Sequence, residues 1–323
     1  MKRILLLLLV SISSFAQSYK FSVGSNITSF VFTNSAGSNP SFLRPSSGLH
    51  LSLSRESKLS KSFLVDYGIN YNQFNNVGDV QNIPFSYATD FIGIQEVDYL
   101  QPRSGGINQT KVIAEKLGLK HWAYLPSLIG TPGERWHKVE DLEKSVITEK
   151  SKQVSKEKSY GIGIATNVAI KKLYLKSLGR SWVGMPLLIP REDAKGVKFI
   201  YVKDEPRIAL IAELENGVTI ANTHLSFVPG VNVFQLNRLS SFMKDLPGDE
   251  LLIGDLNLPG NLPTKVSGFK SLISHSTYPS WKPSIQFDYI MVRKSAQVKV
   301  KPLPTLNTSI SDHVPIGVQL KFQ

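Results

Sequence analysis

The chain has 323 residues, enough for one large domain or two ordinary ones, and its hydrophobic content of 41% is too low for a helical membrane protein. Because it contains no cysteine, disulfides, cysteine-ligated zinc and thiol catalysis are excluded. The formal net charge of +12 favours either an anionic partner, such as nucleic acid, a phosphorylated metabolite or an anionic membrane, or a soluble surface that is simply basic, since the lysines form no dense tract.

Residues 1–16 have the pattern of a secretory signal peptide. Lys2 and Arg3 precede a short apolar stretch at residues 4–10, and Ser14-Phe15-Ala16 places small residues before a cleavage site at Gln17. The stretch is too short to span a membrane, and no other segment is long and apolar enough to cross one as a helix. We therefore expect an exported bacterial protein that is periplasmic, outer-membrane-associated or secreted. A buried helix is the alternative interpretation of this segment.

Residues 17–89 form an atypical N-terminal region that is rich in Ser, Asn and Gly. Alternating polar and apolar residues, at 50–54 and 63–71, predict β-hairpins. The pattern also resembles part of an outer-membrane β-barrel, although the strands are too few to close one. The composition changes near residue 90, so we predict a separate α/β domain over residues 90–323.

The elements predicted for this domain alternate between strands and helices. Helical spacing predicts a helix over Thr110–Leu117, capped by Gly118, and another over Gln235–Leu246 that stops at Pro247-Gly248. Apolar runs predict strands at 91–94, 160–165, 208–214, 218–222, 251–253 and 289–292. Residues 138–158 mix Lys and Glu, which indicates a solvated helix or loop, with a part in shaping a substrate entrance as the alternative.

Acidic, amide and imidazole residues stand at the edges of several apolar runs. They are Glu96 and Asp98, His224, Asp255 and Asn257, Asp288, and Asp312-His313. Since ligands collect at strand ends, the joint pattern predicts one polar site at the rim of a sheet-based core. Each residue alone has a plainer interpretation, because an acid at a strand end is usually solvated and Asp-x-Asn is often a turn.

These residue types suit phosphoester hydrolysis, which needs a cation beside the phosphate, a base that activates water and an acid for the leaving oxygen. Glu96 is the first candidate ligand for Mg²⁺ and Asp312 the second, because this hard cation prefers one or two carboxylates. Asp255 and Asn257 are two residues apart, so on an extended segment they would point the same way. The carboxylate would then orient water while the amide donates to phosphate.

Two histidines are candidates for the acid and base roles. His313 could carry charge near neutral pH and stabilise the phosphate, and Asp288 is the expected partner that holds its tautomer. His224 is the second imidazole. The other histidines are expected to be surface or packing residues: His50, His121, His137 and His275.

A family resemblance follows from the order of these motifs. The series QEVD (95–98), THLS (223–226), GDLN (254–257), FDYI (287–290) and SDH (311–313) resembles the endonuclease/exonuclease/phosphatase superfamily. That superfamily includes pancreatic-type deoxyribonucleases, abasic-site endonucleases, inositol-polyphosphate 5-phosphatases and bacterial sphingomyelinases. Further stretches at 101–105, 204–207, 225–235 and 277–288 look like a bacterial subgroup, and the resemblance covers about residues 90–323.

The resemblance implies a fold and a set of roles. The fold would be a four-layer α/β sandwich, with two packed mixed sheets flanked by helices, and the activity would be phosphoester cleavage dependent on Mg²⁺ or Mn²⁺. By this resemblance Glu96 would bind the metal and Asp312 would lie beside it. Asp255 would orient the attacking water, and Asn257 would contact the phosphate. His313 would be the central imidazole, held by Asp288, and His224 would be a second acid or phosphate contact.

One departure from the family pattern keeps a rival open. The family begins with a strand ending in Asn and then an amphipathic helix, whereas here Asn70 and Asn72 precede a polar segment, 73–90, with Pro84 and no helical period. The leading hypothesis is an exported metal-dependent phosphodiesterase with an anionic phosphoester substrate, first among them nucleic acid. The alternatives are a phospholipid or sugar-phosphate phosphatase and a non-catalytic exported fusion protein that lacks the first core strand.

Overall fold

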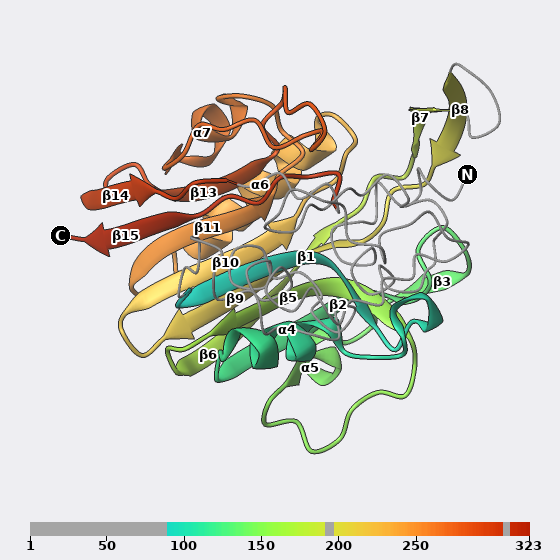
Figure 1. The fold of residues 1–323 in the computed structure, drawn as a ribbon, viewed down its shortest axis with the longest axis horizontal. Helices are drawn as coiled ribbons and strands as arrows, with labels where there is room; N and C mark the ends of the chain where they lie inside the picture. Colours follow the sequence, from blue (N-terminus) through green and yellow to red (C-terminus); the bar gives the residue numbers. More distant parts are fainter. Residues whose placement is uncertain (1–88, 191–196, 306–310) are drawn as a thin grey trace, which may run out of the picture.

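The computed structural model describes residues 89–323 apart from 191–196 and 306–310, and these residues form two packed β-sheets with helices on their outer faces (Figure 1). The predicted four-layer α/β sandwich is therefore confirmed. The predicted signal segment and the atypical N-terminal region, with Asn70 and Asn72, lie outside the described residues.

The first sheet runs in the order β1-β5-β2-β3, with β4 beside β2. Its strands are β1 (Phe91–Tyr99), β2 (His121–Gly130), β3 (Trp136–Lys138), β4 (Ile147–Thr148) and β5 (Ser159–Thr166). All of its described pairings are antiparallel, so the prediction of two mixed sheets is wrong for this one. The reason is that β5 inserts between β1 and β2, which run in the same direction and are joined through α4 (Gln109–Leu117).

The second sheet is mixed and runs in the order β12-β13-β11-β10-β9-β6. Its strands are β6 (Ile170–Gly179), β9 (Arg207–Leu214), β10 (Val218–His224), β11 (Asp249–Asp255), β12 (Phe269–Ser271) and β13 (Asp288–Arg293). Only β10 and β11 pair in parallel among these described strands. A parallel pair needs a crossover connection, and α6 (Val231–Met243) supplies it.

Two smaller hairpins lie at opposite ends of the molecule in Figure 1. They are β7 (Met185–Pro190) with β8 (Val197–Val202), and β14 (Val298–Pro302) with β15 (Val318–Phe322). The remaining helices are α5 (Leu142–Ser145), α7 (Leu262–Ser267) and the 3₁₀ helix η6 (Pro102–Ser104). No helix in the described part of the chain has the length and apolar character needed to cross a membrane.

Helix prediction succeeded where local capping signals are strong. Asn108 caps α4 through its side chain, and Gly118 ends it with a φ of 69°, which glycine adopts without strain. The helix predicted over 235–246 begins earlier, at Val231, because Gly230 turns the chain with a φ of 82° and Asn232 accepts hydrogen bonds from nearby backbone N–H groups. Residues 138–158 contain the end of β3, α5 and β4, followed by a loop.

Apolar side chains fill the three spaces between the four layers. Ile162 and Ile164 of β5 meet Leu210 of β9 and Ile220 of β10 between the sheets. Outside the first sheet, α4 packs Ile113 and Ala114 on a cluster that contains Val97 and Trp122. Outside the second sheet, α6 packs Leu236, Leu239 and Met243 on Ala209, Ile211, Ala221 and Leu252. Burial of these faces fixes the order of the layers.

A buried amide joins the two sheets. Asn222 of β10 is fully buried, and its Nδ2 donates to the carbonyl oxygens of Ile94 at 3.1 Å and Gly163 at 2.9 Å, which belong to β1 and β5. Its Oδ1 accepts from Gln95 Nε2 at 2.6 Å. Gly93 allows this close approach, because a Cβ there would collide with the Asn222 amide and with Ile253.

We predict that Asn222→Ala lowers the free energy of unfolding by about 2–4 kcal/mol, since three buried hydrogen bonds are lost and their partners stay buried. Asn167→Ala, an exposed position just after β5, should change it by less than about 0.5 kcal/mol. Urea unfolding followed by circular dichroism measures both. Equal effects of the two substitutions would contradict a bridging role for Asn222.

Candidate active site

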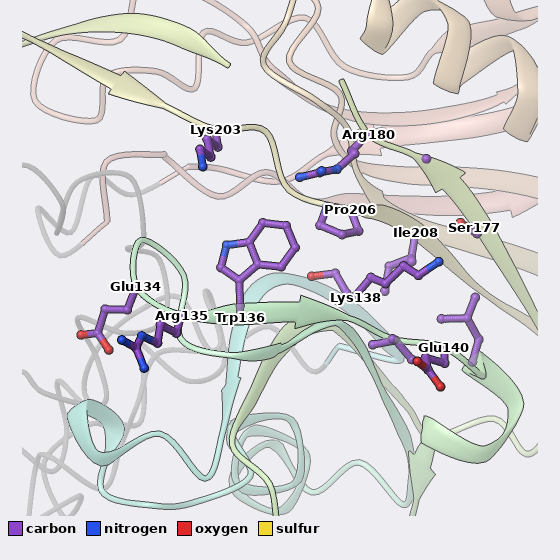
Figure 2. A pocket seen from close by; sticks show the side chains of 14 residues that line it. Glu134, Arg135, Trp136, Lys138, Glu140, Ser177, Arg180, Lys203, Pro206 and Ile208 are labelled. Atoms are coloured by element: carbon purple, nitrogen blue, oxygen red, sulfur yellow. The ribbon is translucent and has the colours of Figure 1, made fainter. Parts of the chain in front are cut away.

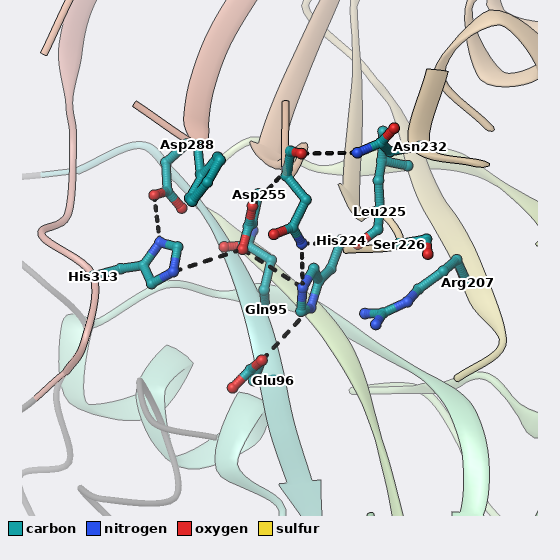
Figure 3. A network of polar contacts seen from close by, with 12 residues as sticks. Gln95, Glu96, Arg207, His224, Leu225, Ser226, Asn232, Asp255, Asp288 and His313 are labelled. Carbon is teal, nitrogen blue, oxygen red and sulfur yellow. Dashed lines mark hydrogen bonds and ion pairs between the residues drawn. The ribbon is translucent and has the colours of Figure 1, made fainter. Parts of the chain in front are cut away.

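Strand register brings three predicted residues side by side at one rim of the second sheet. His224 ends β10 opposite Asp255, which ends β11, and Asp255 lies opposite Asp288, which begins β13. Figure 3 shows these side chains converging with those of Glu96 and His313. The predicted residues therefore meet at one place, although their sequence positions span more than 200 residues.

His313 is held by Asp288. Its Nδ1 lies 2.6 Å from Asp288 Oδ2, and its Nε2 lies 3.9 Å from Asp255 Oδ2. Burial alone would lower the pKa of His313, but the carboxylates of Asp288 and Asp255 outweigh it and raise that pKa well above its usual value. The imidazole is therefore held as a cation, with Nδ1–H donating to Asp288 and Nε2–H facing the site.

His224 has the opposite electrostatic character. Burial, with the positive charges of Arg207 and His313, lowers its pKa well below the usual value, so this imidazole is neutral. Asn257 Nδ2 donates to the Leu225 carbonyl at 3.0 Å and faces His224 Nε2 at 3.2 Å, which makes Nε2 the acceptor. The proton of His224 is thus on Nδ1, 3.8 Å from Glu96 Oε1.

Glu96 reaches the site from within β1, not from its end as the sequence suggested. The pairing with β5 shifts between Ile94 and Val97, which inserts one extra residue, and Glu96 takes a left-handed φ of 59°. Such a β-bulge redirects a side chain, and left-handed backbone is costly for a non-glycine residue. It turns the carboxylate toward the second sheet, where Glu96 Oε2 is buried without a hydrogen-bond partner.

Asp312 lies in the same cluster. It is 3% exposed, and burial raises its pKa to about 8. Its carboxylate also raises the pKa of Glu96, on which burial is the larger influence. The segment at 277–280 positions this loop: Ser280 N donates to the Asp312 carbonyl at 2.7 Å, and the ring of Tyr278 lies 5.1 Å from that of His313.

Asp255 and Asn257 share the site through a turn and not through an extended segment, so that expectation is wrong. Asn257 has a left-handed φ of 48°, and its backbone N–H donates to Asp255 Oδ1 at 2.8 Å, the local hydrogen bond that Asp side chains favour in turns. Asn232 of α6 donates to the Asn257 carbonyl at 2.8 Å. Burial raises the pKa of Asp255 to about 7.

The oxygen donors of this cluster fit a hard divalent cation. Asp255, Asp288 and His313 have ligand atoms within 4.8 Å of one another, but Asp288 and His313 are already paired with each other. Glu96 offers a buried oxygen without a partner, and buried carboxylates are normally paired or bound to a metal. The unpartnered oxygen makes Glu96 compatible with a ligand role, while binding by Glu96 and Asp312 stays a prediction from the sequence.

Two residues of the site were given no role by the sequence interpretation, although one of them lies in the stretch 204–207 that looks like a bacterial subgroup. Arg207, which begins β9, is 6% exposed, and its Nε has no hydrogen-bond partner. Figure 3 shows its guanidinium beside His224. Asn222 was read as part of an apolar run. The residue types alone carried no signal for either role, because both depend on which strands become neighbours.

The remaining histidines of the described chain lie elsewhere. His121 Nδ1 is 3.1 Å from Glu149 Oε1, while His137 and His275 are exposed. His50 lies outside the described residues. Asp98, which the sequence placed beside Glu96, is fully buried and paired with Arg103 at 2.6 Å, away from the cluster.

Comparisons with known proteins show a likeness to solved structures. Neither the protein-family models nor the curated proteins give a match. An endonuclease/exonuclease/phosphatase family protein from Leptotrichia buccalis matches at 16% identity, over 82% of this chain and 92% of its own, with a TM-score of 0.46. One from Bacteroides thetaiotaomicron matches at 15% identity, over 82% and 88%, with a TM-score of 0.44.

A third structure, a mannosyl-6-phosphatase from Bacteroides thetaiotaomicron, matches at 15% identity over 66% of this chain and 81% of its own, with a TM-score of 0.39. The first two structures bear the name of the superfamily that the sequence motifs resemble.

We predict that Glu96→Gln raises the melting temperature of the metal-free protein, because burial and Asp312 both oppose the charged form of Glu96. The same variant should lose stabilisation by Mg²⁺. The unsubstituted protein should gain about 2.7 kcal/mol at a Mg²⁺ concentration 100 times its Kd. Differential scanning calorimetry with and without Mg²⁺ measures both effects.

The matched control is Glu157→Gln, an exposed loop position, which should leave both melting temperatures unchanged. Retention of the full Mg²⁺ effect in Glu96→Gln would remove Glu96 from the set of ligands.

Proposed function

We propose that this chain is an exported, divalent-metal-dependent phosphoesterase that hydrolyses phosphodiesters, with nucleic acid as its leading substrate class. One observation carries the proposal: four buried or half-buried carboxylates and two imidazoles converge at the rim where the two sheets meet. Titratable groups with perturbed pKa values gather at catalytic sites, and acid–base chemistry on a phosphate would use such groups. The motif series in the sequence supports the same reaction class.

The chain's own groups divide the reaction between them. Asp255 is placed to orient the attacking water, because its Oδ2 lies 3.5 Å from His224 Nε2 and 3.9 Å from His313 Nε2. The cationic His313, with Nδ1 tied to Asp288, presents Nε2–H to a phosphate oxygen and stabilises the charge that develops there. The Asn257 amide is beside His224, and it would have to exchange its hydrogen bond to His224 Nε2 to donate to a second phosphate oxygen.

A divalent cation held by Glu96 and Asp312 would supply Lewis-acid charge to the phosphate and the leaving oxygen. The neutral His224 lies between Glu96 and Asp255 and links these two parts of the site. Its low pKa keeps a second positive charge away from the cation. The two imidazoles thus serve different purposes despite their common side chain.

Export is inferred from residues 1–16, and the basic surface would draw in an anionic substrate. Appearance outside the cytoplasm of a chain that begins at Gln17 supports it, and retention of Met1 in the cytoplasm would contradict it. A phosphatase acting on phospholipids or sugar phosphates would use the same groups. A substrate panel of DNA, RNA, sphingomyelin, sugar phosphates and bis-nitrophenyl phosphate separates these activities.

We predict that His313→Gln lowers kcat/KM by about 10²–10³-fold on the preferred substrate, since the loss of one positioned donor to the developing charge costs a factor of this size. His275→Gln, at an exposed position in the loop after β12, should keep full activity. Chelation of divalent cations should abolish turnover, and Mg²⁺ or Mn²⁺ should restore it. Steady-state kinetics on the substrate panel gives these values.

Turnover that survives both chelation and Asp255→Ala would refute the mechanism. A folded protein with no turnover of any substrate in the panel would favour the rival, a non-catalytic exported protein.

A further inference from the structure

An open cavity of about 990 Å³ is lined by residues from both sheets, and exposed charged side chains form much of its lining (Figure 2). The cluster draws its residues from β1, β10, β11 and β13, whereas the cavity is lined from β2, β3, β6 and β9. In the second sheet β9 and β6 follow β10 directly, whereas in the first sheet β5 separates β1 from β2. Gly179 at the end of β6 pairs with Arg207 at the start of β9. Along the second sheet the cavity is therefore a lateral continuation of the rim that carries the cluster.

Arg207 connects the two places. Its neighbours Pro206 and Ile208 line the cavity, while its own guanidinium lies beside His224. The Arg207 Nε is buried and lacks a hydrogen-bond partner, so this cation has a free donor at the border between cluster and cavity. A substrate that enters the cavity at this point would reach the catalytic groups without leaving the rim.

The cavity offers an aromatic face and an excess of positive charge. Trp136 projects into it, and the guanidinium carbon of Arg180 lies 5.5 Å from the centroid of the Trp136 ring. Lys203 and Lys138 also line it. With Arg135 the lining holds four cations, against the two glutamates at positions 134 and 140.

Two exposed aromatic residues stand close in sequence to cations of this lining. Trp182 is 99% exposed and stands two residues after Arg180, and Tyr201 is 63% exposed and stands two residues before Lys203. Alternating cations and aromatic rings are the arrangement that binds single-stranded nucleic acid, because phosphates contact the cations and bases stack on the rings.

We propose that the cavity around Trp136, Arg180 and Lys203 is a subsite for single-stranded nucleic acid. It would take a nucleotide adjacent to the phosphodiester in the catalytic cluster, with a base on the Trp136 ring and a backbone phosphate on Arg180 and Lys203. This inference rests on the proposed function and specifies its substrate. A simple sugar phosphate has no flat ring to stack and would leave most of the cations without a contact. A flat bilayer would not fill a cavity lined from both sheets.

Binding in the presence of a chelator tests the subsite without any turnover. The probe is a fluorescein-labelled oligothymidylate of ten nucleotides, and fluorescence anisotropy of the full chain gives its Kd. Trp136→Ala should raise that Kd by about tenfold, while Trp136→Phe, which keeps a ring, should change it by less than about threefold. Lys203→Ala should lower the slope of the logarithm of the binding constant against the logarithm of the salt concentration by about 0.7. The control is Lys299→Ala, an exposed lysine on the distant β14, which should raise the Kd no more than the loss of any other exposed lysine.

Hydrolysis of bis-nitrophenyl phosphate should be unchanged in Trp136→Ala, because this small substrate occupies only the catalytic cluster.

Unchanged oligothymidylate binding in folded Trp136→Ala would overturn the subsite. Equal loss in Lys203→Ala and Lys299→Ala would also overturn it, since it would show diffuse attraction. Loss of binding to phosphatidylserine vesicles in Trp136→Ala, with oligothymidylate binding intact, would identify a membrane surface instead. If oligothymidylate binds as predicted but no substrate turns over, the proposed function fails while the subsite stands.

Discussion

The cluster of Glu96, His224, Asp255, Asp288, Asp312 and His313 lies on a frame set by the hydrogen bonds that Asn222 makes across the two sheets. His224, Asp255 and Asp288 come from strands of the second sheet, whereas Glu96 comes from β1 of the first sheet. The cluster therefore forms only if β1 is held at a fixed distance and register relative to β10. The Asn222 amide bonds to Ile94 and Gln95, the two residues immediately before Glu96. Apolar packing alone would leave the sheets free to shift, because it is not directional. The amide converts loose packing into a defined position for Glu96.

The carboxylates near this hydrogen-bonded contact are buried close together, which is electrostatically unfavourable. Burial raises the pKa of Glu96, Asp255 and Asp312 together, and such buried carboxylates oppose folding at neutral pH. Glu96 and Asn257 also hold left-handed backbone that other positions avoid. Strain and crowded charge at one rim, above a well-packed core, mark a site maintained for binding or catalysis and not for stability.

The sequence allowed much of the site to be predicted, and the reasons can be seen in particular residues. His224, Asp255 and Asp288 stand beside apolar runs that became β10, β11 and β13, so strand ends located them. Glu96 was expected at a strand end but lies on a bulge, which only the pairing of β1 with β5 reveals. The local pattern of Asp255-Leu256-Asn257 could not distinguish a turn from a strand. Asn222, Arg207 and the Trp136 cavity depend on contacts between distant strands, which one sequence does not display.

The central claim is that these dispersed groups surround one divalent cation. Anomalous diffraction from crystals of the full chain soaked in Mn²⁺ tests it most directly, because the anomalous signal locates the ion independently of any assumed role. The account predicts a peak within bonding distance of the carboxylates of Glu96 and Asp312, about 2.0–2.2 Å for such a cation. The absence of a peak at the rim would contradict it, and so would a peak at other acids that is not within bonding distance of Glu96 or Asp312.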